Sequence, residues 1–195
     1  LAESWCLSCP PDGPSHIASR PMQGLPLPDY ITRQGRHILG SHCQGLPDFP
    51  VLVKLIDAKQ SLSVQVHPDD AYAFAHEEQQ GKTEMWYVID CEPDAYLYIG
   101  FEQPVTKTEV EEAIRTGRLE SLLRWVPVHP GDTFLIEAGT VHAIGAGILL
   151  AEVQQSSNIT YRLYDYGRTD VDGRPRPLHI EKALAVANLA PTDTT

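Results

Sequence analysis

The sequence has little of two features that mark particular classes of protein. No apolar run approaches the roughly 18 residues that a membrane-spanning helix needs, and the longest candidates, such as GILLAEV, have the length of a strand. Basic residues are also few, since 15 Lys and Arg stand against 26 Asp and Glu and the net charge is −11. Nucleic acids and anionic membranes attract an excess of basic surface, so this charge argues against both as partners. A small anionic substrate remains compatible, because a few converging Lys and Arg side chains can bind it.

Cysteine is scarce as well. Four cysteines in 195 residues are too few for a disulfide scaffold. Cys6 and Cys9 form a C-x-x-C, the spacing of a zinc knuckle or a redox pair, but no second pair follows and no βαβ pattern surrounds it. We therefore interpret the two as incidental thiols and expect a reducing, cytoplasmic compartment. The sequence shows no signal-peptide pattern and opens on Leu1, and we expect its true N-terminus to lie further upstream.

The distribution of residues along the chain predicts one mainly β domain over 1–195. Residues 1–50 are rich in proline and glycine, which favours turns and extended segments over helix. After them come short runs of β-branched and aromatic residues, punctuated by HPDD, EPDA, HPGD and IGAG. Strands at this spacing are typical of a sandwich or barrel. The predicted strands are 51–58, 61–67, 84–90, 95–101, 132–139, 147–155 and 160–166.

Three segments predict helices instead. Residues 69–81 have an Asp start and a Gly stop. Residues 106–126 have helical apolar spacing, an N-cap at Thr106 or Thr108 and a break near Gly117. Residues 179–190 form the third.

The run LSVQVHPDD carries the first sign of chemistry. Alternate side chains of a strand share a face, so Gln65 and His67 point one way while Val64 and Val66 point the other. Polar groups turned into a barrel interior need partners. Glu84 begins the next strand, and His142 follows the glycine turn after 132–139.

Together these residues offer two imidazoles, one carboxylate and one amide oxygen, from Gln65, His67, Glu84 and His142. Such nitrogen and oxygen ligands suit zinc, with iron, manganese or cobalt as alternatives. Other polar residues have candidate roles. Glu152 lies within an apolar strand, where burial would raise its carboxyl pKa toward neutrality and suit it as a base. Lys82 shares a strand face with Glu84. An outward-facing Glu152 and a surface Lys82 are the plain alternatives.

Two resemblances sharpen these expectations. The pattern G-x₅-(P/E)-x-G-x₂-H from Gly131 is similar to the second cupin motif, with Glu137 where cupins most often have Pro. Four runs of the sequence resemble, in order, the type I mannose-6-phosphate isomerases, particularly their short bacterial form. They are LIDAKQSLSVQVHPDD, GKTEMWYVID, AGTVHAIGAGILLAEVQQSSNITYRLYDYGR and HIEKAL. The resemblance implies a cupin jelly roll (double-stranded β-helix) barrel with a few inserted helices. It also implies that the family's N-terminal segment and its smaller C-terminal β domain are missing here.

The resemblance further implies a zinc-dependent aldose–ketose isomerase with one zinc ion per chain. Such an enzyme interconverts mannose 6-phosphate and fructose 6-phosphate by proton transfer through an enediolate that zinc stabilises. The family's metal ligands match Gln65, His67, Glu84 and His142. Arg162 and Glu152 match residues at the family's sugar site. Lys82 would assist ring opening or bind phosphate. Lys54 and Glu3 would face the site and bind substrate. For Arg162 an ion pair at the rim is the alternative, and for Lys54 a side chain that reaches the surface. Which cations bind the phosphate stays open.

Two rival functions remain. A non-catalytic cupin could bind a sugar phosphate, although it would not need the full set of Lys82, Arg162 and four ligands. A redox cupin oxygenase usually presents two His and one carboxylate with open positions, so Gln65 disfavours it. Trp86 and Tyr87 are interpreted as core residues.

Overall fold

The computed structural model describes residues 2–43, 45–46, 49–169 and 172–192. Its strands form two five-stranded antiparallel sheets. The first has the order β1-β2-β9-β4-β7, and the second has the order β10-β3-β8-β5-β6. The first sheet comprises β1 (Ala2–Leu7), β2 (Val51–Ala58), β9 (Ile148–Gln155), β4 (Glu84–Cys91) and β7 (Thr133–Ile136). The second comprises β10 (Tyr161–Tyr164), β3 (Val64–Val66), β8 (His142–Ile144), β5 (Tyr96–Phe101) and β6 (Leu123–Pro127).

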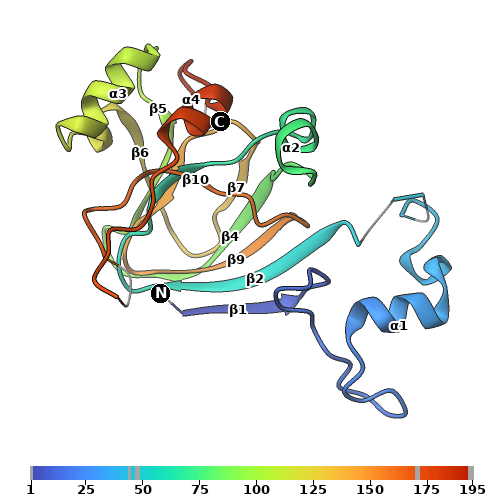
Figure 1. Ribbon diagram of the computed structural model, residues 1–195. Coiled ribbons are helices and arrows are strands. Elements are labelled where there is room, and N and C mark those ends of the chain that lie inside the picture. The colour runs from blue at the N-terminus through green and yellow to red at the C-terminus, as the bar shows by residue number, and fades with distance from the viewer. Residues whose placement is uncertain (1, 44, 47–48, 170–171, 193–195) are drawn as a thin grey trace.

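The order of the strands is that of a jelly roll. From β2 to β5 the chain changes sheet at every step, and from β6 to β10 it does so again. Figure 1 shows the two layers, with β1, β2 and β9 side by side along one of them. The prediction of a mainly β jelly roll with a few helices is confirmed.

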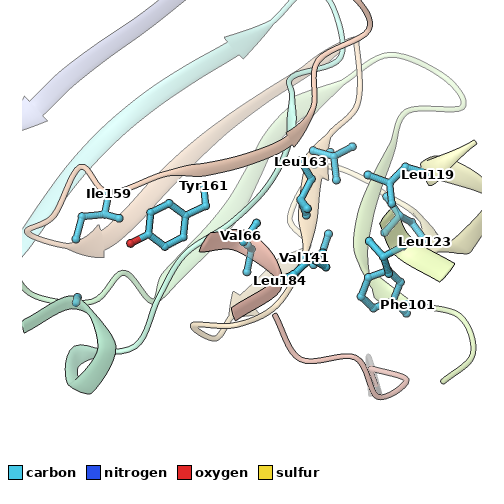
Figure 2. Close-up of a cluster of buried hydrophobic side chains, with 14 residues drawn as sticks. Val66, Phe101, Leu119, Leu123, Val141, Ile159, Tyr161, Leu163 and Leu184 are labelled. Carbon is cyan, nitrogen blue, oxygen red and sulfur yellow. The ribbon is translucent and has the colours of Figure 1, made fainter. Parts of the chain in front are cut away.

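Two hydrophobic clusters fill the interior. One lies between the sheets and is built around Trp86, Val88, Leu97 and Leu150. The other, shown in Figure 2, joins the second sheet to the helices through Val66, Phe101, Val141, Leu163 and Leu184. Val66 belongs to this second cluster because alternation along β3 turns it away from Gln65 and His67. The apolar face of β3 thereby fixes the direction of its polar face.

The helices lie at the rims of the sheets (Figure 1). They are α1 (Leu27–Gln34), η1 (Arg36–Leu39), α2 (Asp70–Glu77), α3 (Lys107–Arg115), η2 (Leu119–Leu122) and α4 (Ile180–Val186). Asp69 caps α2, since its carboxylate accepts from the Tyr72 N–H at 2.8 Å. Thr106 starts α3 with a capping box, and Gly117 at φ +68° follows its end. The predicted start of α2 and the break near Gly117 are confirmed.

Several predictions about elements were wrong. Helix α1 lies within 1–50, where proline was taken as evidence against helix; Pro28 sits in the first turn, which tolerates it. Helix α2 ends at Glu77 and not at Gly81, because Glu78 takes the left-handed conformation that ends a helix, with φ 55° and ψ 30°. Gly81 instead packs against the backbone at the start of α2. A Cβ there would stand 2.5 Å from the Asp69 backbone carbonyl carbon. The end of predicted helix 106–126 is strand β6, and the short strand β8 was missed.

Among the described residues, no helix is long and apolar enough to cross a membrane. None of the four cysteines, all of them described, forms a disulfide.

Candidate active site

Strand pairing brings the predicted ligands to one place. Gln65 on β3 lies opposite His142 on β8. Glu84 is the first residue of β4 in the facing sheet, and His67 follows the end of β3. Together, His67, Glu84 and His142 present ligand atoms that all lie within 4.8 Å of one another. All three side chains are 1% exposed. This buried group of two imidazoles and a carboxylate can hold a metal ion.

Contacts behind the imidazoles orient them toward the centre of the group. The Nδ1 of His67 lies 2.8 Å from the Ile159 carbonyl oxygen, and that of His142 lies 2.8 Å from the Thr140 carbonyl oxygen. Each ring therefore donates its Nδ1–H to the backbone and keeps a lone pair on Nε2, as metal-binding histidines do. Burial lowers the pKa of His67 to about 3, with help from the charge of Lys82, and burial also lowers the pKa of His142. Both rings are thus neutral, the form that binds a metal.

Glu84 supplies the charge of the group. Burial by itself raises the pKa of this carboxyl, but the charge of Lys82 acts most strongly in the opposite direction, and the pKa stays well below its usual range. Its Oε1 lies 3.2 Å from His67 Nε2 and 2.9 Å from Lys82 Nζ, yet accepts no hydrogen bond from the described residues. A buried carboxylate oxygen with a free lone pair is costly unless a ligand uses it. The group therefore fits a bound cation.

Gln65 lies at the edge of this group. Its amide nitrogen is 3.4 Å from His142 Nε2. Rotation of the amide by half a turn brings its oxygen to the same position, where it would complete the predicted set of four ligands.

Glu152 stands on β9 directly opposite Lys54 on β2. It is 4% exposed, its Oε1 lies 3.2 Å from Lys54 Nζ, and burial and the nearby charge of Glu84 raise its pKa to about 7. Its other oxygen accepts a hydrogen bond from Trp86 Nε1 at 3.0 Å. The same N–H reaches Glu84 Oε2 at 3.1 Å. One indole thus bridges a predicted base and a predicted metal ligand.

The remaining predicted residues surround a cavity of about 500 Å³. Lys54 also lies 3.6 Å from Glu3 Oε1 and 5.2 Å from the centre of the Trp5 ring. Arg162 on β10 pairs with Gln65 and donates from Nη1 to the Pro177 carbonyl oxygen at 3.0 Å. The cavity is lined by Glu3, Lys54, Gln65, Lys82, Glu152 and Arg162, together with Arg168, Arg176 and other residues. His67, Glu84 and His142 are not among its lining residues, but they contact Gln65 and Lys82, which are.

Sequence reasoning missed three residues of this region. Trp86 was interpreted as core, and it is fully buried, but its N–H also joins two carboxylates. Its period-two spacing from Glu84 was the available signal. Arg168 and Arg176 were not singled out, although Arg168 ends the run TYRLYDYGR. The interpretation of Tyr87 as core was wrong, because its side chain points away from the interior and is 45% exposed.

Fold and site together define a jelly-roll protein with a buried site for a metal ion beside a charged cavity. Residues 1–94 match the family model described as phosphomannose isomerase type I, catalytic domain. The chain is 43% identical to mannose-6-phosphate isomerase of Streptococcus mutans over 96% of its length, and 45% identical to mannose-6-phosphate isomerase ManA of Bacillus subtilis over 94%. It covers 58% of each of these relatives.

A solved structure agrees with these matches. The mannose 6-phosphate isomerase from Bacillus subtilis aligns with a TM-score of 0.90 and 41% identity, over 99% of this chain and 60% of that one. The chain is similar to the type I phosphomannose isomerases over nearly all of its own length, and it spans less than two thirds of the length of the relatives named here.

Proposed function

We propose that the protein is a metal-dependent aldose–ketose isomerase that interconverts mannose 6-phosphate and fructose 6-phosphate. The observation that carries the proposal is the bridge through Trp86. This hydrogen-bond bridge holds Glu152, whose pKa is about 7 and which lines the cavity, next to the proposed metal ligand Glu84. The relatives named above supply the substrate pair.

We propose one zinc ion per chain, held by Gln65, His67, Glu84 and His142. Two neutral imidazoles, a carboxylate and an amide oxygen form a nitrogen and oxygen donor set that suits zinc. When bound, zinc supplies a Lewis acid that polarises the sugar carbonyl.

Glu152 is the proposed base. Aldose–ketose isomerisation moves one proton between neighbouring carbons, so a single carboxylate can remove it from one and return it to the other. A pKa of about 7 leaves Glu152 partly ionised near neutral pH, and so able both to take the proton and to give it back. Lys54 at 3.2 Å fixes one oxygen of the carboxylate and Trp86 fixes the other.

The cations of the cavity have separate proposed roles. Arg162 brings a permanent positive charge next to Gln65 and can stabilise the enediolate oxygens. Lys82 lies 2.9 Å from Glu84 and lines the same cavity, where it can assist opening of the sugar ring. Glu3 and Lys54, which contact each other, would bind sugar hydroxyls.

The proposed partner is a small sugar phosphate, with neither nucleic acid nor membrane, in a reducing cytoplasmic compartment. A sugar-phosphate binder without activity and a redox oxygenase are the rivals. Binding of fructose 6-phosphate without turnover by zinc-loaded protein would favour the first, and oxygen uptake with Fe(II) would favour the second.

The test compares Glu152→Gln with Glu111→Gln, a matched control at an exposed position on α3. Glu152→Gln should retain its zinc by elemental analysis, but lose roughly 10²–10⁴-fold in turnover and stop exchanging the C2 proton of the sugar with solvent. Glu111→Gln should behave as wild type. Full activity in zinc-replete Glu152→Gln would exclude this carboxyl as the base.

A further inference from the structure

Among the described residues, the end of the cavity defined by Arg162, Arg168 and Arg176 has one carboxylate in contact with its arginines, that of Asp165. Arg162, Arg168 and Arg176 all line the cavity there. Asp165, which is 4% exposed, is the carboxylate that Arg168 and Arg176 share. The cavity's lysines differ, because Lys54 contacts Glu152 and Glu3, and Lys82 contacts Glu84. Among the described residues, the three arginines of the cavity therefore have fewer carboxylate partners than its two lysines.

Asp165 holds the two arginines in fixed orientations. Arg176 donates from Nε to Oδ2 at 2.5 Å and from Nη2 to Oδ1 at 2.7 Å, a bidentate contact. Arg168 donates from Nη2 to Oδ1 at 2.5 Å and from Nη1 to the Ser61 carbonyl oxygen at 2.7 Å, and its guanidinium lies 5.1 Å from the centre of the Tyr166 ring. The Nη1 of Arg176 makes no hydrogen bond to any described residue, which leaves it available to a ligand.

The positive charges of Arg168 and Arg176 also act on Arg162. Burial, followed by the charges of Arg176 and Arg168, lowers its guanidinium pKa, and Asp165 only partly opposes them. Its Nε is buried without a hydrogen-bond partner among the described residues. A buried donor without a partner is unfavourable, and so is the repulsion that Arg168 and Arg176 exert on Arg162, and a bound anion would relieve both.

We propose that Arg168 and Arg176, oriented by Asp165, bind the phosphate group of the substrate. That this phosphate belongs to a hexose phosphate rests on the proposed function. Arginine suits the task because its planar fork donates two parallel hydrogen bonds to phosphate oxygens. The contacts to Asp165 and Ser61 orient the side chains before binding, which reduces the conformational entropy lost when the anion arrives.

The position of the pair agrees with the geometry of the reaction. Both arginines lie in the segment after β10, and Arg162 on β10 stands opposite Gln65, a predicted metal ligand. The reacting carbons and the phosphate occupy opposite ends of a hexose phosphate. Gln65 and the arginine pair line the same cavity, which can therefore hold both ends at once.

The test uses the single variants Arg168→Gln and Arg176→Gln, because each leaves Asp165 with one arginine and so protects the fold. Arg115→Gln removes the same charge from the exposed end of α3 and serves as the control. Calorimetry measures binding of inorganic phosphate, which needs no turnover, and steady-state kinetics give KM and kcat for fructose 6-phosphate. Thermal unfolding and zinc content verify that each variant is intact.

Each cavity variant should bind phosphate about 10- to 100-fold more weakly and show a similar rise in KM, because it loses charge-assisted hydrogen bonds. Its kcat should change much less. Arg176→Lys should recover part of the affinity, since it keeps the charge but not the fork. Wild-type phosphate affinity and KM in folded, zinc-loaded Arg168→Gln and Arg176→Gln would overturn the assignment.

The two proposals can fail separately. A protein that binds phosphate through these arginines but isomerises nothing would keep this inference and refute the proposed function. Isomerase activity with no effect of either arginine on phosphate binding or KM would do the reverse.

Discussion

Replacement of Lys54 by Met should move the pH dependence of activity in a direction that the contacts of Glu152 determine. Lys54 Nζ lies 3.2 Å from Glu152 Oε1, both side chains are largely buried, and the lysine charge lowers the pKa of Glu152. Burial and Glu84 act in the opposite sense and bring the pKa to about 7. Without the lysine the raising effects are less opposed, so the pKa of Glu152 rises.

The size of the effect can be worked out. An opposite charge at this separation typically changes a carboxyl pKa by roughly 1 to 3, so the smallest expected change brings Glu152 to about 8. A base works only when deprotonated. At pH 7 the ionised fraction of Glu152 would fall from about one half to about one tenth, whereas at pH 9 it would be above roughly nine tenths in both proteins. Activity of Lys54→Met should therefore be about fivefold lower at the pH of the wild-type midpoint and nearly restored about 2 pH units above it.

The assay is the pH profile of kcat for wild type, Lys54→Met and Lys59→Met, the last being an exposed lysine just beyond the same strand. A bound divalent cation lowers the Glu152 pKa in all three proteins, so the difference between midpoints is the quantity to compare. The midpoint of Lys54→Met should be higher by about 1 or more, with that of Lys59→Met unchanged. An equal loss of activity at every pH would refute the reasoning and indicate that Lys54 serves the sugar alone, without an effect on the pKa of Glu152.

Three further predictions follow from other contacts. His142→Ala should lose bound zinc, measured by elemental analysis after dialysis, because it removes one of the two buried imidazoles; full zinc content would contradict the ligand assignment. Trp86→Phe should lower kcat by about tenfold through loss of a hydrogen bond to a charged group, with KM little changed because Trp86 does not line the cavity; a rise in KM alone would count against its bridging role. Phe101→Ala should reduce the free energy of unfolding by about 3–5 kcal/mol in denaturant titration, since the ring is fully buried in the cluster of Figure 2; a loss below 1 kcal/mol would contradict that packing.

Much of the fold follows from local pattern. The run VLVKLIDA predicts β2 with its observed bounds, and the Asp69 cap of α2 follows from residue type alone. The failures have physical causes. Proline in 1–50 was counted against helix, although the first turn of α1 accommodates it. Gly81 was interpreted as a helix stop, but it is small because it touches the backbone of Asp69. Strand β8 has only three residues, too few for a period to be recognised.

The sequence by itself determined which kinds of groups face the site. Period two along a strand places Gln65 with His67, and Lys82 with Glu84, because that alternation is a property of the local backbone. The ligand types follow directly from the residues. Their nature as nitrogen and oxygen donors needed no knowledge of the fold.

Only the tertiary structure decided how these groups meet. The contact between Lys54 and Glu152, the Trp86 N–H shared by two carboxylates, and the pair of arginines on Asp165 all depend on strand pairing and loop packing. Arg168 reaches the carbonyl oxygen of Ser61, a residue far away in the sequence. Such contacts depend on how the two sheets align and on which distant apolar faces are buried together. The packing of the whole core determines both, so no local sequence period predicts which residues will meet.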